Sequence, residues 1–284
     1  EQTKKQGDPA AGELVYRRVQ LACVVCHAIG GAGGKVGPEL TSMGASAPLD
    51  YIIESVLNPA AKVKEGFHAV NLTLKDGKQV MGIQARETNE ELFLRDAAGG
   101  EQAVIKAEIT GRETIGSIMP AALVDSLTER ERLNLYAFLG QLGKPGPFDA
   151  SKGTVARAWK LYPNSAADQL AKGEDAAPQF PVFTMVDGRL IKELLDPVLP
   201  IVSDGQQPFL AVARFQTTTP GKVRLNLTGV TKATLNGEAL PAASEPSFVR
   251  ELPAGVHTLV VKLDPKGLPA ELRAESPDAR FLTE

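Results

Sequence analysis

The chain has 284 residues, of which 43% are hydrophobic, and its formal net charge at pH 7 is −3. This length exceeds that of most single hydrophobic cores, so we expect two or three domains. The near-balanced charge argues against a nucleic-acid-binding protein, and no apolar stretch is long enough for a membrane-spanning helix, so we expect a soluble protein.

The first predicted element is a helix that runs from Asp8 to Val25. Asp8 is a suitable N-cap, Pro9 fits the first turn of a helix, and apolar residues follow at helical spacing. Ahead of this helix, residues 1–8 are polar and contain no apolar signal-peptide core, so any export signal has been removed. The apolar positions of the helix are Leu14, Val15, Val19 and Ala22.

The helix leads into Cys23-Val24-Val25-Cys26-His27, which is the pattern of covalent haem c attachment. Each cysteine can form a thioether with a haem vinyl group, and the histidine beside the second cysteine can bind the iron. The chain contains 2 cysteines, and both lie in this motif. The pattern therefore predicts one haem c, covalently attached through Cys23 and Cys26, with His27 as an axial iron ligand.

Two other roles for the cysteine pair stay open with less support. A redox dithiol requires no histidine after the second cysteine, and a structural zinc site requires four ligands. The remaining histidines, His68 and His257, lie far away in the sequence. We therefore prefer haem to a redox or zinc site.

Residues 30–34 are rich in glycine and predict a flexible loop that passes the haem edge. They do not form a phosphate-binding loop, because the lysine that follows them precedes a valine instead of serine or threonine. Next comes Gly37-Pro38-Glu39-Leu40, where we expect the Pro38 carbonyl to accept the imidazole N–H of His27. This hydrogen bond would fix the tautomer that binds iron.

A short helix is predicted at residues 49–57, and after it the hydrophobic period changes from helical to alternating. Alternation and turn residues then predict four short strands. These strands indicate a small β-barrel or roll inserted at about residues 66–110. Their predicted ranges are 67–74, 79–85, 91–95 and 102–106.

The strongest helical pattern covers residues 128–142, where Thr128 and Glu131 form a capping box. Glycine and prolines end this helix, so we place the main domain boundary within residues 143–152. The prediction is a first domain at residues 8–147 and a second domain at residues 148–284.

The second domain is predicted to be a β-sandwich of about 100 residues. Trp159 and Tyr162 are assigned to a short helical or irregular lead-in, with Trp159 as a core residue, and β structure is expected from about Phe180 onward. Asn236-Gly237 predicts a tight hairpin turn. The predicted strands are 209–217, 221–227, 232–236 and 256–263.

A second axial ligand would decide whether the iron transfers electrons or binds small molecules. Met119 is the preferred candidate, because Pro120 after it stiffens the loop that would carry the sulfur. Met43, His68 and an open site stay as alternatives, whereas the other methionines, Met81 and Met185, are expected to be packing residues. Apolar side chains are expected to keep water from the iron: Leu40, Ile52, Val56 and Ile118.

Residues 10–147 resemble a class I cytochrome c domain, with CVVCH, GPEL and IMP in order, a helix before the first motif and another after the last. More narrowly, they resemble the haem-binding cytochrome c domain that planctomycete and verrucomicrobial bacteria often fuse to large exported proteins. The matching segments are GELVYRRVQLACVVCHAIGGAGGKVGPELTSMGA, NPAAKVKEGF, LKDGKQVMGI and GSIMPAALVDSLTERE.

This resemblance covers residues 10–147 and implies an all-α class I cytochrome c core. Together with the inserted β module and the C-terminal β-sandwich predicted from the strand patterns, it gives an expected multidomain α+β protein. It implies His27 and Met119 as axial ligands, Cys23 and Cys26 as covalent anchors, and outer-sphere electron transfer instead of enzymatic catalysis. It also implies an exported, periplasmic location and a redox partner protein such as a dehydrogenase or oxidase.

Two other functions are kept as hypotheses. The first is a haem enzyme or gas sensor with a displaceable sixth ligand. The second is a binding or adhesion protein in which the C-terminal domain docks a protein or a carbohydrate. Aromatic residues make up only 5% of the chain, which gives a sugar-stacking surface little support.

Overall fold

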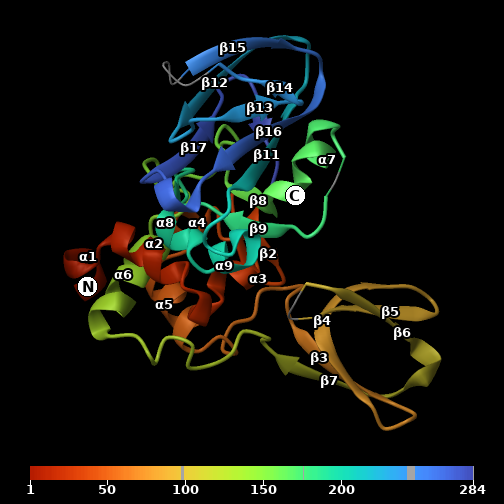
Figure 1. Cartoon of the computed structure of the whole chain (residues 1–284). Coiled ribbons are helices and arrows are strands. Elements are labelled where there is room, and N and C mark those ends of the chain that lie inside the picture. The colour runs from red at the N-terminus through yellow and green to blue at the C-terminus, as the bar shows by residue number, and fades with distance from the viewer. Residues whose placement is uncertain (97–98, 175, 242–246, 284) are drawn as a thin grey trace. The chain divides into compact units, whose positions relative to one another are not determined.

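The computed structural model describes residues 1–96, 99–174, 176–241 and 247–283. The chain divides into two compact units, Glu1–Phe148 and Asp149–Glu284. It is a mixed α+β structure, with 24% helix and 35% strand in several antiparallel sheets, which confirms the predicted α+β class (Figure 1). None of the described helices has the length and the apolar character needed to span a bilayer.

The first unit begins with helices α1 (Gln2–Gln6) and α2 (Pro9–Tyr16). The carboxylate of Asp8 accepts hydrogen bonds from the first backbone N–H groups of α2, as the N-cap prediction requires. The predicted continuation of this helix to Val25 is wrong. Helix α2 ends at Tyr16, and a 3-10 turn η1 (Val19–Leu21) and the one-turn helix α3 (Cys23–Cys26) follow.

The predicted helix is too long because apolar residues at helical spacing are not always buried. Leu14 and Val19, two of the residues that suggested the long helix, are 44% and 65% exposed. The buried residues of α2 are Gly12, Glu13, Val15 and Tyr16. Tertiary packing therefore selects a different face, and the chain can leave the helix before the cysteines.

Helix α6 (Glu129–Leu139) has the predicted capping box between Thr128 and Glu131 and ends before the predicted limit, with Gly140 at its C-cap. Helices α2 and α6 cross at Gly12. A Cβ atom on Gly12 would lie 1.9 Å from the carbonyl oxygen of Asn134, so only glycine permits this approach.

The glycine-rich segment is not the predicted flexible loop. It forms a hairpin of β1 (His27–Ile29) and β2 (Ala32–Lys35), with Gly30 and Gly31 at positive φ in the turn. Helices α4 (Met43–Ser46) and α5 (Leu49–Leu57) follow, and α5 matches the predicted helix.

The inserted β module is an antiparallel sheet of five strands in the order β6-β5-β4-β3-β7 (Figure 1). The described residues form no closed barrel, so the barrel form of the prediction is wrong. The fifth strand was missed because most of its residues are exposed and lack apolar alternation; it forms by pairing with β3. The strands are β3 (Ala69–Leu74), β4 (Gln79–Glu87), β5 (Glu91–Arg95), β6 (Glu101–Ile105) and β7 (Ile109–Gly116), with a short 3-10 turn η2 (Lys106–Glu108) before the last.

The second unit contains two antiparallel sheets, ordered β10-β17-β12-β15 and β14-β13-β16-β11-β8-β9, with β18 also paired to β11. One apolar core takes side chains from both sheets. The strands are β8 (Ala158–Pro163), β9 (Phe180–Phe183), β10 (Leu190–Ile191), β11 (Phe209–Thr217), β12 (Gly221–Thr228), β13 (Ala233–Leu235), β14 (Glu238–Ala239), β15 (Ser247–Leu252), β16 (Gly255–Leu263), β17 (Glu271–Glu275) and β18 (Arg280–Phe281).

The helical or irregular lead-in predicted for Trp159 and Tyr162 is wrong, because both residues lie in strand β8 between β9 and β11. The expected core role of Trp159 is confirmed by its 1% exposure. Asn236-Gly237 has the positive φ angles of a tight hairpin turn, also as predicted. The helical pieces of this unit are η3 (Asn164–Ala166), α7 (Ala167–Ala171), α8 (Lys192–Leu195), α9 (Leu199–Ser203) and η4 (Pro265–Gly267).

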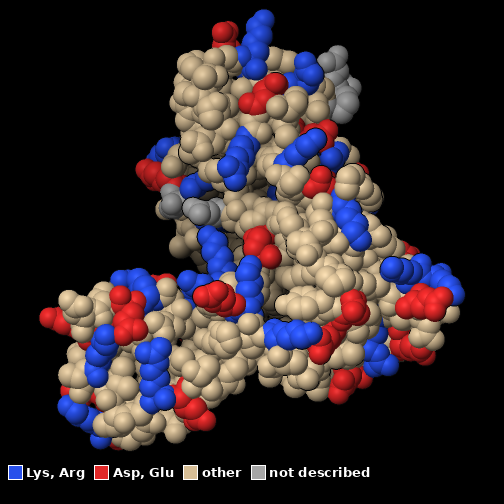
Figure 2. All heavy atoms as spheres, turned by 180° about the vertical axis from the view of Figure 1, so that it is seen from behind, with Lys and Arg blue, Asp and Glu red and all other residues tan. Residues whose placement is uncertain are grey.

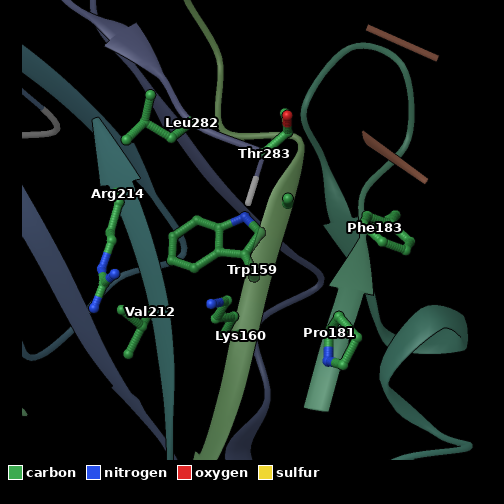
Figure 3. Close-up of a pocket in the computed structure, with 9 residues that line it drawn as sticks. Trp159, Lys160, Pro181, Phe183, Val212, Arg214, Leu282 and Thr283 are labelled. Carbon is green, nitrogen blue, oxygen red and sulfur yellow. The ribbon is translucent and has the colours of Figure 1, made fainter. Parts of the chain in front are cut away.

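A small cavity of about 70 Å³ lies beside strands β8, β9 and β11 (Figure 3). Its lining includes Lys160, Phe183 and Arg214, together with Trp159. On the face seen in Figure 2, basic and acidic side chains of the described residues are interspersed.

Candidate haem site

The two cysteines lie on one turn of helix. Cys23 and Cys26 are the first and last residues of α3, and both thiols are free and half-buried. Residues three apart lie on the same side of a helix, so both sulfur atoms can face one ligand. Ala22, between η1 and α3, has a left-handed φ of 52°.

His27 follows α3 as the first residue of β1, and its ring is held from the segment after β2. The Pro38 carbonyl oxygen lies 2.8 Å from Nδ1 of His27, which is the contact predicted from the sequence. With the proton on Nδ1, this nitrogen donates to the carbonyl, and Nε2 keeps the lone pair that a metal ion requires.

Gly37 packs directly on the imidazole ring and was missed as a site residue. A Cβ atom at this position would lie 2.4 Å from Cε1 and 2.6 Å from Nδ1 of His27. The backbone N–H of Gly37 also donates to the carbonyl oxygen of Cys26 at 2.7 Å. The sequence analysis places Pro38 beside His27, but only the fold shows that the glycine before it packs on the same ring.

The β1–β2 hairpin packs against the cysteine turn through glycine. A Cβ atom on Gly34 would lie 1.7 Å from the carbonyl oxygen of Val25. Glycine at position 34 therefore allows the backbone of β2 to approach the backbone of the cysteine turn closely.

Tyr16 is a second residue that sequence reasoning missed. Its hydroxyl donates to the carbonyl oxygen of His27 at 2.8 Å, and its side chain is buried. This hydrogen bond joins the end of α2 to the start of β1, a contact that no local pattern indicates.

Burial controls the protonation of the motif. It raises the pKa of the Cys23 thiol to about 11 and also raises the pKa of Cys26. It lowers the pKa of His27, against the opposing effects of the Pro38 hydrogen bond and of Glu39. His27 is therefore neutral at pH 7, which is the state in which imidazole binds a metal ion.

The other predicted site residues lie in three segments of the first unit. Leu40 is buried, and its backbone N–H donates to the carbonyl oxygen of Ala28 at 2.9 Å, so it lies beside the hairpin. Ile52 is 2% exposed on α5. Ile118 and Met119 are half-buried in the segment between β7 and α6, where the Met119 N–H donates to Ser117 Oγ at 3.1 Å. The second-ligand role of Met119 stays a prediction.

The alternative ligands, Met43 and His68, both lie in the first unit. Met43 is half-buried at the start of α4, and His68 is exposed just before β3. Met81 is 55% exposed on β4, and Met185 is buried in the second unit. The packing role expected for Met81 is therefore wrong, and that for Met185 is consistent with its burial.

The residues present fit a covalently bound haem. The site offers two thiols on one helical turn, a neutral histidine with Nδ1 already bonded, and a ring position that tolerates only glycine beside it. Among the described residues, no group of three or more His, Cys, Asp and Glu side chains is placed to hold a metal ion by itself. No protein-family model matches the chain, and no curated protein matches it.

Proposed function

We propose that this protein is a monohaem c-type cytochrome that transfers electrons by an outer-sphere route. The proposal rests on one observation: Cys23 and Cys26 lie on one helical turn, and His27 follows it directly with Nδ1 hydrogen-bonded to the Pro38 carbonyl. A bound haem supplies a one-electron couple at its iron.

The chain's own residues have distinct parts in this proposal. Cys23 and Cys26 anchor the cofactor through thioether bonds, so that it cannot dissociate. His27 offers Nε2, and the Pro38 carbonyl holds the proton on Nδ1 and limits rotation of the ring. Gly37 leaves room for the ring in this orientation.

Met119 is proposed as the second axial ligand, with Ile118 beside it as part of an apolar shield. A thioether sulfur favours the reduced state more than a second imidazole does. The Ser117 hydroxyl accepts the Met119 N–H and so orders the segment that would present the sulfur. Leu40 and Ile52 are the proposed apolar residues on the other segments of this unit.

The location and the partner are part of the proposal. Covalent haem attachment normally takes place outside the cytoplasmic membrane, so we propose an exported or periplasmic protein. Its partner would be a redox protein such as a dehydrogenase or oxidase. The second unit, proposed as a β-sandwich, would dock a protein more readily than a carbohydrate, because aromatic residues are few.

Mass spectrometry tests the proposal directly. The chain is produced with a c-type haem maturation system and measured under denaturing conditions. We expect the mass of one haem added to the wild-type chain. A Cys23→Ser, Cys26→Ser double variant should carry none, while a Met81→Leu variant on the exposed side of β4 should keep it.

A wild-type mass equal to that of the bare chain would refute haem attachment. A reduced protein that carries haem and binds carbon monoxide at neutral pH would instead indicate an open or displaceable site, as in a haem enzyme or gas sensor.

A further inference from the structure

We infer that Tyr16 is a positioning residue for the axial histidine, an inference that rests on the proposed function. The hydroxyl of Tyr16 donates to the main-chain carbonyl oxygen of His27 at 2.8 Å. Tyr16 is only 2% exposed, so this hydrogen bond is shielded from competing water.

The tyrosine can act as a fixed support because its own side chain has little freedom. Its ring centroid lies 5.6 Å from that of Phe138 on α6, at the crossing of α2 and α6. The guanidinium of Arg17 lies 5.7 Å from the Tyr16 ring centroid, and Arg17 forms a buried ion pair with Glu13 at 2.9 Å. The hydroxyl is therefore carried by a side chain that packs against Phe138 of α6 and beside the Arg17–Glu13 ion pair.

The carbonyl that accepts this bond lies at an irregular place in the hairpin. The register between β1 and β2 shifts between His27 and Ala28. The residue without a partner is Gly34 on β2, so the regular ladder is interrupted opposite His27. Tyr16 adds a hydrogen bond there and ties His27 to α2.

His27 is consequently held from two directions. Pro38 bonds the imidazole ring, and Tyr16 bonds the peptide group. The first contact sets the tautomer and the ring plane, while the second sets the position of the backbone from which the ring extends. Loss of the second contact should leave haem attachment intact but widen the range of imidazole orientations.

Tyr136 provides a matched control in the same unit. It is 5% exposed on α6, and its buried hydroxyl has no hydrogen-bond partner among the described residues. Removal of either hydroxyl deletes one buried oxygen from a tyrosine. The two changes differ in the bond to His27.

The test compares Tyr16→Phe and Tyr136→Phe with the wild-type protein, all matured with haem. Denaturing mass measurement checks attachment, circular dichroism checks folding, and the reduction potential and the electron paramagnetic resonance of the ferric state report on the axial histidine. We expect Tyr16→Phe to keep the haem mass and the fold, to shift the potential, and to shift and broaden the ferric signal. Tyr136→Phe should match the wild type in all four measurements.

Unchanged potential and ferric signal in Tyr16→Phe would overturn the inference, and so would equal shifts in both variants. A Tyr16→Phe protein that fails to fold or to acquire haem would overturn it too, because the hydroxyl would then serve folding or maturation instead of ligand position. A wild-type chain without haem would refute the proposed function itself, which the mass measurement distinguishes from these outcomes.

Discussion

Burial sets the chemical state of the side chains in the haem motif before any cofactor is attached. The thiol of Cys23 is half-buried, and burial raises its pKa to about 11. In the unfolded chain the same thiol ionises in its ordinary range. Between the ordinary pKa of a thiol and about 11, the folded chain keeps a proton that the unfolded chain loses. The stabilisation that the buried neutral thiol contributes is therefore lost as the pH rises through this window.

This shift predicts slow alkylation of Cys23 in the haem-free protein. Since the thiolate is the reactive form, a pKa near 11 lowers its fraction at pH 8 by about 100-fold relative to an unfolded chain. A Cys26→Ser variant isolates Cys23, and reaction with iodoacetamide is followed by mass spectrometry with and without denaturant. Equal rates in both conditions would show that the folded thiol is not shielded.

At the scale of elements, the crossing of α2 and α6 is linked to the Cys23–His27 segment through Tyr16. The backbone N–H of Asp8 donates to Oδ1 of Asn134 at 2.9 Å, and Gly12 contacts the carbonyl of the same residue. Tyr16 stands one turn further along α2 and reaches His27. The helix crossing and the histidine are therefore connected through one short helix.

A Gly12→Ala variant tests this crossing. Alanine favours a helix by up to about 1 kcal/mol over glycine. The added Cβ would nevertheless lie 1.9 Å from the Asn134 oxygen, so the helices must separate. We expect a net loss of about 1–3 kcal/mol in the free energy of unfolding, measured with denaturant. Gly111→Ala on β7, where the Cβ would make an ordinary 3.4 Å contact with Thr73, is the control and should change little.

No loss of stability in Gly12→Ala would show that the two helices can separate without cost. The close approach would then not be what positions Tyr16.

At the scale of the whole molecule, the chain consists of two units that each have their own apolar core. The core of the second unit combines residues of both its sheets and includes Trp159, Phe209 and Phe215. A compact unit with its own core can in principle fold alone.

We therefore predict that residues 149–284 fold without the first unit. Trp159 is the only tryptophan of the chain and is 1% exposed, so its fluorescence reports on this unit. The isolated fragment should show a buried-tryptophan emission that is lost in one cooperative transition with denaturant. Emission typical of a solvated tryptophan in the absence of denaturant would contradict the prediction.

The features that the sequence alone determined are those set by near neighbours. The capping box of Thr128 and Glu131, helix α5 and the Asn236-Gly237 turn each depend on residues a few positions apart. Strand β11 has its predicted limits, because residues 209–213 form a buried apolar run and Phe215 continues the buried side.

Tertiary structure alone decided the features that depend on distant partners. The end of α2 follows from burial against α6, strand β7 from pairing with β3, and strand β8 from its place between β9 and β11. The contacts of Tyr16 and Gly37 with His27 arise in the same way. Hydrophobic periodicity shows which residues are apolar. Which of them are buried, and which strands pair, depends on packing between segments that are far apart in the chain.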